Sequence, residues 1–204
     1  MKTSTLIKQL YDSAKNNYDF CDIIDLSNGL NRNIVLTDID ASIGDSVNSY
    51  IQFFNRIDQE KKIDANKRTP IKIYIDSNGG NLEACFTIID AITMSKTPVW
   101  TINIGKAYSA GFFIFITGHK RFAYPNSSFL FHEGSTGIYQ DANKFKNYAD
   151  FYKQQLEQLR AITLEHTQIE PEEYDKHVKD DWWFNVDEAL KYGVTDKISY
   201  KLIY

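Results

Sequence analysis

Apolar residues follow two alternating spacings along the middle of the chain. Segments with every second residue apolar predict β-strands, and segments with apolar residues three or four positions apart predict helices. In order, these are a strand over Ile71–Ile75, a helix over Leu82–Met94, a strand over Val99–Ile104, a buried helix over Ala110–Thr117 and a strand over Ser128–His132. The first strand should end at the turn signal Ser77–Gly80. This alternation predicts an α/β fold with an at least partly parallel sheet.

A long amphipathic helix is predicted over Asp141–Thr167, where aromatic and aliphatic residues recur three or four positions apart. At 1.5 Å per residue it would extend roughly 40 Å, more than a domain of this size covers. We therefore expect part of it to pack on another subunit, although burial within one monomer is the alternative. A further helix should begin near Pro171, and Asn185–Glu188 has the pattern of a capping box ahead of a last helix that ends before Gly193.

Composition narrows the class of protein. Of 204 residues, 43% are hydrophobic and 25% are charged, which is typical of a folded chain and excludes a mainly disordered one. A formal net charge of −4 argues against a nucleic-acid partner. No apolar run approaches the ~20 residues of a membrane span, and the first residues are too polar for a signal peptide. We expect a cytoplasmic protein with no membrane contact, built as one domain over residues 31–204 behind a less regular N-terminal arm over residues 1–30.

Two cysteines, Cys21 and Cys85, lack the spacing of a metal site and are interpreted as reduced thiols. Cys85 falls on the apolar face of the helix predicted over Leu82–Met94, so it should pack in the core. No phosphate-binding, dinucleotide-binding or metal-binding motif occurs, and we expect neither a metal nor another cofactor.

Three predicted strand ends carry residues that could take part in binding or catalysis. The ligand sites of open α/β sheets lie at such strand ends. At Gly79–Gly80, backbone N–H groups could hold negative charge, or the glycines could simply make a turn. Ser109 lies between a strand and the buried helix, where it could be a nucleophile or a helix cap. His132 ends an apolar strand beside a glycine-rich segment and is a candidate general base.

A serine nucleophile also needs a carboxylate to orient its base. Asp180 and Asp181 precede the apolar residues Trp182–Phe184, which could hold an acid in a partly buried position, but spacing alone does not choose between them. The other histidines, His119, His166 and His177, lie in polar contexts and should be surface residues.

Four segments, in order along about residues 30–199, resemble one family pattern. They are Pro70–Gly80, Ile104–Gly111, Lys120–Ser127 with Phe131–His132, and Glu188–Ile198. Together they resemble the ClpP family, the proteolytic subunits of Clp protease. The resemblance implies a crotonase-like fold of repeated βαβ units, with Asp141–Thr167 as a protruding handle helix.

The same resemblance implies a serine endopeptidase that cleaves peptides and unfolded polypeptides through an acyl-enzyme. Ser109 would be the nucleophile, His132 the general base and Asp181 the orienting carboxylate, chosen over Asp180 by its distance to the Glu188 motif. The backbone N–H groups of Gly80 and Ala110 would form the oxyanion hole. The substrate peptide would bind along a segment made of Gly134, Ser135, Thr136 and Gly137.

The implied partners are further copies of the chain and an ATPase. The resemblance implies heptameric rings stacked as a tetradecamer around a degradation chamber, fed by an AAA+ unfoldase. Two departures from the family pattern concern these partners. Lys72 replaces a tyrosine of the pocket that docks the ATPase, and Asp180 replaces an arginine expected to contact the position of Asp141 across the two rings. Two facing acids should weaken the double ring or make it pH-dependent.

Three alternatives remain open at this point. The chain could be a catalytically silent ring subunit that regulates an active one, or a crotonase-type acyl-CoA enzyme that uses the two N–H groups without Ser109 and His132. It could also be a viral or accessory maturation protease with the same chemistry.

Overall fold

A computed structural model of the chain describes residues 31–134 and 141–203. Its strands are β1 (Asn33–Ile39), β2 (Ile71–Gly80), β3 (Val99–Tyr108), β4 (Lys120–Ala123), β5 (Ser128–Phe131), β6 (Trp182–Asn185) and β7 (Lys197–Ile198). Its helices are α3 (Ala41–Glu60), the short 3₁₀ turn η1 (Ala65–Lys67), α4 (Leu82–Thr93), α5 (Ala110–Ile116), α6 (Ala142–His166), α7 (Pro171–His177) and α8 (Val186–Lys191). The predicted N-terminal arm, residues 1–30, lies outside the described residues.

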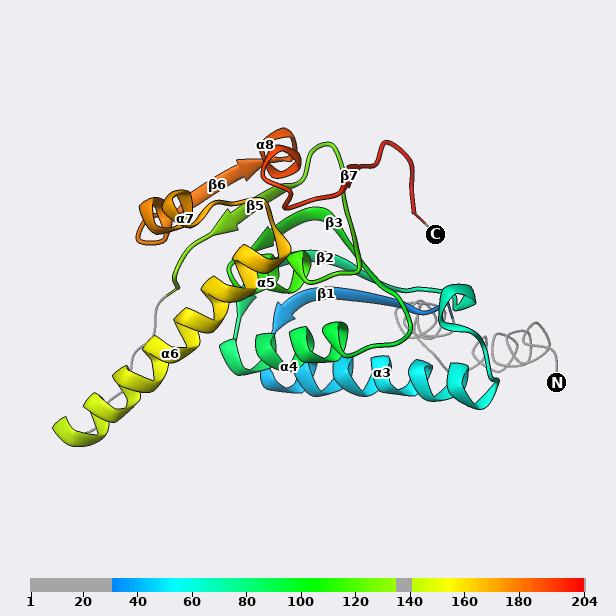
Figure 1. Cartoon of the computed structure of the whole chain (residues 1–204), viewed down its shortest axis with the longest axis horizontal. Helices are drawn as coiled ribbons and strands as arrows, with labels where there is room; N and C mark the ends of the chain where they lie inside the picture. Colours follow the sequence, from blue (N-terminus) through cyan, green and yellow to red (C-terminus); the bar gives the residue numbers. More distant parts are fainter. Residues whose placement is uncertain (1–30, 135–140, 204) are drawn as a thin grey trace, which may run out of the picture.

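The strands form one sheet in which β3 is shared between two branches. β1, β2 and β3 pair in parallel, and the first half of β3, Trp100–Asn103, continues in parallel to β4 and then β7. The second half, Lys106–Tyr108, pairs instead with β5, whose other neighbour is the antiparallel strand β6. Figure 1 shows β5 and β6 leaving the main sheet together with α7 and α8. The predicted α/β class and its mainly parallel sheet are confirmed.

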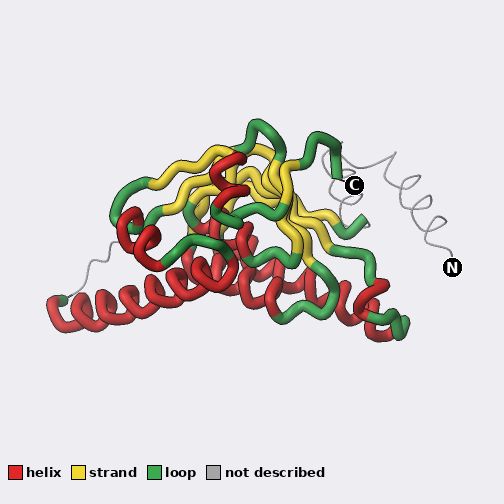
Figure 2. The backbone as a smooth tube through the Cα atoms, turned by 45° about the horizontal axis from the view of Figure 1, so that its top comes forward, coloured by secondary structure: helices red, strands yellow, loops and turns green. Residues whose placement is uncertain are grey.

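Helices α3 and α4 cover one face of the sheet, as Figure 2 shows for the helices below the strands. The short helix α5 is buried along its entire length, because all seven of its residues are inaccessible or nearly so. Burial of apolar surface is the main driving force for such packing, at about 25 cal/mol per Å². Cys85 belongs to this core at 0% exposure, as predicted, and burial raises the pKa of its thiol. Cys21 lies outside the described residues.

The turn predicted at Ser77–Gly80 is wrong, because β2 continues through these residues to Gly80. Gly79 and Gly80 have φ values of +100° and +152°, and Gly80 pairs with Ile39 of β1. A Cβ atom on Gly80 would lie 2.1 Å from the Ile39 carbonyl oxygen. The glycines are therefore required by a close approach between neighbouring strands at an unusual φ, and they do not reverse the chain.

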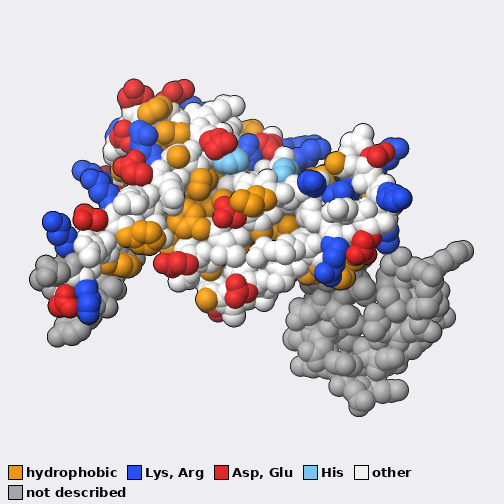
Figure 3. Space-filling view, turned by 60° about the horizontal axis from the view of Figure 1, so that its bottom comes forward, with side chains coloured by type: hydrophobic (Ala, Val, Ile, Leu, Met, Phe, Trp, Pro, Cys, Tyr) orange, Lys and Arg blue, Asp and Glu red, His pale blue; other side chains and the backbone are white. Residues whose placement is uncertain are grey.

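Helix α6 occupies Ala142–His166, one residue shorter at each end than the prediction. Asp141 is its N-cap and accepts a hydrogen bond from the Lys144 backbone N–H. Figure 1 shows the first half of α6 projecting from the body, and Figure 3 shows hydrophobic side chains among charged ones on that limb. Phe145 and Phe151 expose 52% and 53% of their surface there. One chain does not cover this half of the helix, and its packing on another subunit stays a prediction.

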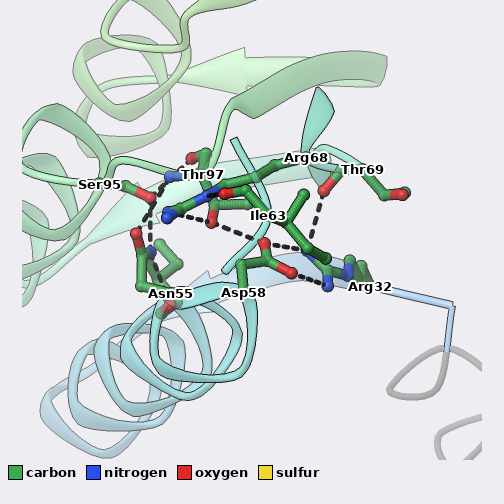
Figure 4. Close-up of polar contacts among 9 residues, drawn as sticks. Arg32, Asn55, Asp58, Ile63, Arg68, Thr69, Ser95 and Thr97 are labelled. Carbon is green, nitrogen blue, oxygen red and sulfur yellow. Dashed lines mark hydrogen bonds and ion pairs between the residues drawn. The ribbon is translucent and has the colours of Figure 1, made fainter. Parts of the chain in front are cut away.

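A buried ion pair ties the end of α3 to the start of the sheet, as Figure 4 shows. Asp58 is fully buried and accepts two hydrogen bonds from the Arg32 guanidinium, at 2.7 and 2.6 Å. Thr97, which precedes β3, donates a third hydrogen bond to the same carboxylate. The bonds from Arg32, followed by that from Thr97, hold the pKa of Asp58 below its usual value despite burial. This charge pair could not be predicted from the sequence, because its members lie far apart along the chain.

The helix start and the helix end predicted near the C-terminal end of the described residues are both present in the structure. Asn185 and Glu188 form the predicted capping box at the start of α8, with both reciprocal hydrogen bonds present. Gly193 has the positive φ of +63° that suits the residue after a helix. None of the helices in the described ranges is both long and apolar enough to span a membrane.

Candidate active site

Ser109 lies at the junction between β3 and α5 in a strained backbone conformation. Its φ of 52° and ψ of −121° are rare for a residue with a side chain, and such strain tends to occur at functional sites. Ser109 is the N-cap residue of α5, but its side chain makes no capping hydrogen bond. The alternative in which the serine side chain caps the helix is therefore wrong, and no described residue makes a hydrogen bond to its hydroxyl.

The strained backbone of Ser109 is held from two sides. Its N–H donates to the Leu130 carbonyl of β5 at 3.0 Å. On the other side Gly79 packs so closely that a Cβ there would lie 2.7 Å from the Ser109 Cβ and 2.9 Å from the Tyr108 carbonyl oxygen. The glycine pair singled out in the sequence thus supports the serine conformation directly.

His132 and Asp181 approach each other through the register of one antiparallel strand pair. Phe131 at the end of β5 pairs with Trp182 at the start of β6, so the next residue of each strand end, His132 and Asp181, face each other. The His132 Nδ1 and Asp181 Oδ1 atoms are 3.5 Å apart, with 30% and 59% of the respective side chains exposed. Asp180 instead lies in the preceding turn, where its N–H donates to the His177 carbonyl.

Ser109 and His132 line the same pocket, which has a volume of about 370 Å³. Gly80 and Ala110, whose N–H groups are the predicted oxyanion hole, also line it. Within the described residues no direct hydrogen bond joins the Ser109 hydroxyl to the His132 ring. Such contacts often tighten only when substrate is bound.

The rest of the pocket contains residues that the sequence did not indicate as functional. Phe113 of α5 and Leu159 of α6, each 3% exposed, line it together with Gln155, which is 7% exposed. Tyr148 and Tyr152, expected only as members of an apolar helix face, line it as well. One feature of the sequence could have indicated this part of the pocket. Gln155 is a polar residue one turn from Tyr152 and Leu159 on the otherwise apolar face of α6.

The predicted substrate segment is described only at its first residue. Gly134 lines the pocket with a φ of +80°, whereas Ser135, Thr136 and Gly137 lie outside the described residues. Its neighbour Glu133 also lines the pocket, and its backbone carbonyl accepts a hydrogen bond from the Tyr152 hydroxyl.

The other histidines do not reach this pocket. His119 is exposed, as expected, and accepts a hydrogen bond from the Val99 N–H at its Nδ1 atom. The expectation of a surface position is wrong for His166 and His177, which are half-buried. His177 stacks on Trp182 with ring centroids 4.2 Å apart, because the apolar residues after Asp181 provide a surface for it. Within residues 31–134 and 141–203, no three His, Cys, Asp or Glu side chains gather as metal ligands would.

Comparisons with known proteins found relatives of similar sequence and of similar fold. The model of the family described as Clp protease matches residues 28–201. The ATP-dependent Clp protease proteolytic subunit 2 of Treponema denticola is 35% identical over 132 residues, which are 64% of this chain and 66% of that protein. The protein of the same name from Pseudomonas aeruginosa is 34% identical over 131 residues, or 63% of this chain and 65% of that protein. These alignments span slightly less than two thirds of the relatives' length.

Among solved structures, a ClpP1 mutant from Listeria monocytogenes has a similar fold, with a TM-score of 0.74 and 25% sequence identity. The similarity covers 88% of this chain and 97% of that one. The family match extends over Ser109, His132 and Asp181 and over nearly all of the described fold. The resemblance seen in the four sequence segments is thereby confirmed, and the chain belongs to the Clp protease family.

Proposed function

We propose that the chain is a Clp-type serine endopeptidase subunit that hydrolyses peptides and unfolded polypeptides. Ser109 is the nucleophile, His132 the general base and Asp181 the carboxylate that orients the base. The observation that carries the proposal is the strained Ser109, whose hydroxyl makes no cap and lines one pocket with His132.

The reaction follows from the chemistry of these groups. His132 accepts the hydroxyl proton as Ser109 Oγ attacks the peptide carbonyl carbon, and the carbonyl oxygen becomes an oxyanion. The N–H groups of Gly80 and Ala110 stabilise that charge, and the protonated His132 then gives its proton to the leaving amine. Water, activated by His132, hydrolyses the resulting acyl-enzyme and restores the serine.

The test is hydrolysis of a fluorogenic peptide by the wild type and by Ser109→Ala. Because nucleophile and base act as a unit, kcat should fall by about 10⁶ in the variant. The matched control is Ser46→Ala, an exposed serine on α3, which should retain wild-type activity. Retained activity in Ser109→Ala would instead favour a crotonase-type use of the two N–H groups. A wild type that neither cleaves peptides nor reacts with a fluorophosphonate at Ser109 would identify a silent ring subunit.

We further propose that the chain works as a homo-oligomer of heptameric rings, stacked as a tetradecamer, together with an AAA+ ATPase. The relatives' names, which include "ATP-dependent" and "proteolytic subunit", support this assembly, as do the uncovered aromatic residues of α6. Lys72 alters the proposed ATPase pocket. It is 7% exposed, its ammonium lies 3.4 Å from the Asn33 side-chain oxygen, and burial lowers its pKa.

The proposed contact between Asp141 and Asp180 across the rings remains open to test. Asp141 already caps α6 and lies 3.3 Å from the Lys144 ammonium, which offsets part of any repulsion. Sedimentation measured over a range of pH and salt concentration would test whether the double ring is weakened. A tetradecamer insensitive to both would contradict a weakened double ring.

A further inference from the structure

A buried amide, that of Gln155, lines the pocket beside Ser109. Only 7% of the Gln155 surface is exposed, yet no residue in the described ranges makes a hydrogen bond to its side chain. No side-chain nitrogen or oxygen of the described residues is both fully buried and unpaired, so this amide keeps contact with solvent. The solvent that it can reach is in the pocket, which Gln155 lines.

Two other amides of the fold have partners. Asn103, at 0% exposure, donates to the Ser128 carbonyl, and the half-buried Asn55 bonds to both Ser95 and the backbone of Thr97. A buried polar group that loses water without gaining a partner costs about 1–3 kcal/mol. An occupant of the pocket that displaces water from Gln155 must therefore offer it a hydrogen bond.

The charge of the pocket indicates which polar group would fit. Glu83 and Glu133 line it, no Lys or Arg does, and neither carboxylate forms an ion pair with another described residue. Glu133 lies beside Tyr152, whose hydroxyl donates a hydrogen bond to the Glu133 backbone carbonyl. Burial, followed by the charge of Glu133, raises the pKa of Tyr152. The pocket therefore favours a cation.

The remaining surface is apolar, as the stem of a long cationic side chain requires. Leu82, Phe113 and Leu159 provide it in the pocket that Ser109 and Gln155 also line. Lysine and arginine bury their methylene stems against such surfaces while their charged heads reach polar groups.

We infer that this pocket selects substrates with lysine or arginine as the residue whose carbonyl Ser109 attacks. Gln155 accepts a hydrogen bond from the cationic head through its amide oxygen, and Glu133 supplies the opposite charge. An apolar side chain of similar length would leave Gln155 without water or a partner, so the site also discriminates against it. This inference rests on the proposed function of Ser109.

The experiment measures kcat/KM for fluorogenic peptides that differ only in the residue before the scissile bond: Lys, Arg, Gln, Leu or Met. The wild type should cleave the Lys and Arg peptides at least about tenfold faster than the Leu and Met peptides. Gln155→Leu should reverse this preference by about tenfold or more in favour of Leu. Glu133→Gln should slow the Lys and Arg peptides alone, and added salt should produce the same selective loss in the wild type.

Two variants serve as matched controls. Gln154→Leu changes an exposed amide on the same helix, and Glu60→Gln removes one exposed carboxylate at the end of α3. Both should leave the ratio of rates unchanged. If Gln155→Leu does not fold, Glu133→Gln and the salt series decide the question.

Two results would overturn the inference. Ser109-dependent cleavage in which Leu or Met peptides equal or exceed Lys and Arg peptides would refute the basic preference and leave the proposed function intact. Absence of Ser109-dependent cleavage for every peptide would refute the proposed function, and the inference with it.

Discussion

Replacement of Gly79 by alanine should slow the chemistry of the candidate active site as well as strain the fold. The new Cβ would lie 2.7 Å from the Ser109 Cβ, whereas apolar carbon atoms pack at about 3.5–4.0 Å. Ser109 must therefore move by about 1 Å. A displacement of that size from a reactive geometry costs about 10²-fold in rate, or about 2.7 kcal/mol at about 1.36 kcal/mol per tenfold.

The same substitution also strains the backbone, because Gly79 has a φ of +100°. A residue with a side chain in this region costs about 1–3 kcal/mol. The assay is the second-order rate of Ser109 labelling by a fluorophosphonate, measured together with the urea midpoint of unfolding. We expect Gly79→Ala to fold with reduced stability and to label about 100-fold more slowly.

Gly193→Ala separates the two effects. Gly193 has a φ of +63°, and its added Cβ would meet the Gln168 side chain at 2.8 Å, outside the pocket of Ser109. It should lose stability to a similar extent and keep its labelling rate within about twofold. A folded Gly79→Ala variant that labels as fast as the wild type would refute the argument that Gly79 supports the serine conformation.

Two further substitutions test the scaffold. Asp58→Asn should lower the free energy of unfolding by about 3–5 kcal/mol at about pH 7, because it leaves the Arg32 charge unpaired. The control Asp64→Asn, in an exposed ion pair, should lower it by less than about 0.5 kcal/mol. The pKa of Asp58 is lowered in the folded chain, so its stabilisation is present above the ordinary value of 3.8 and disappears as pH falls through the lower folded pKa. Urea unfolding of wild type and Asp58→Asn should therefore converge in acid, and a constant difference would contradict this. Asn185→Ala removes half of a capping box and should lower stability by about 1 kcal/mol, with Tm lower by about 2–4 °C in calorimetry.

The fold was predictable from the sequence wherever one periodic pattern covers a whole element. The helices over Leu82–Thr93 and Ala142–His166 and the core strands agree with the spacing of their apolar residues. Four strands were not predicted. β4, β6 and β7 have only two to four residues, too few to show alternation, and β1 buries only Leu36 and Ile39, which do not alternate. They exist because longer neighbours offer them hydrogen bonds, which no local pattern records.

The candidate site was predictable in its residue types but not in its geometry. Ser109 and His132 were identified from their places at strand ends, and the choice of Asp181 depended on a family resemblance. The pairing of Phe131 with Trp182 gives a physical reason for that choice, since it brings the 181 position opposite His132. Strand register across about 50 residues of chain is a tertiary property, as is the burial of Gln155. The catalytic roles themselves stay predictions until Ser109→Ala is tested.

The branching of β3 divides the candidate site between two parts of the sheet. Ser109 follows the end of β3, whereas His132 and Asp181 flank the β5–β6 ladder, which pairs with β3 along Lys106–Tyr108. The hydrogen bond from the Ser109 N–H to the Leu130 carbonyl ties that ladder to the serine itself. A displacement of the ladder would therefore move the imidazole and the carboxylate together and would also disturb the backbone of Ser109.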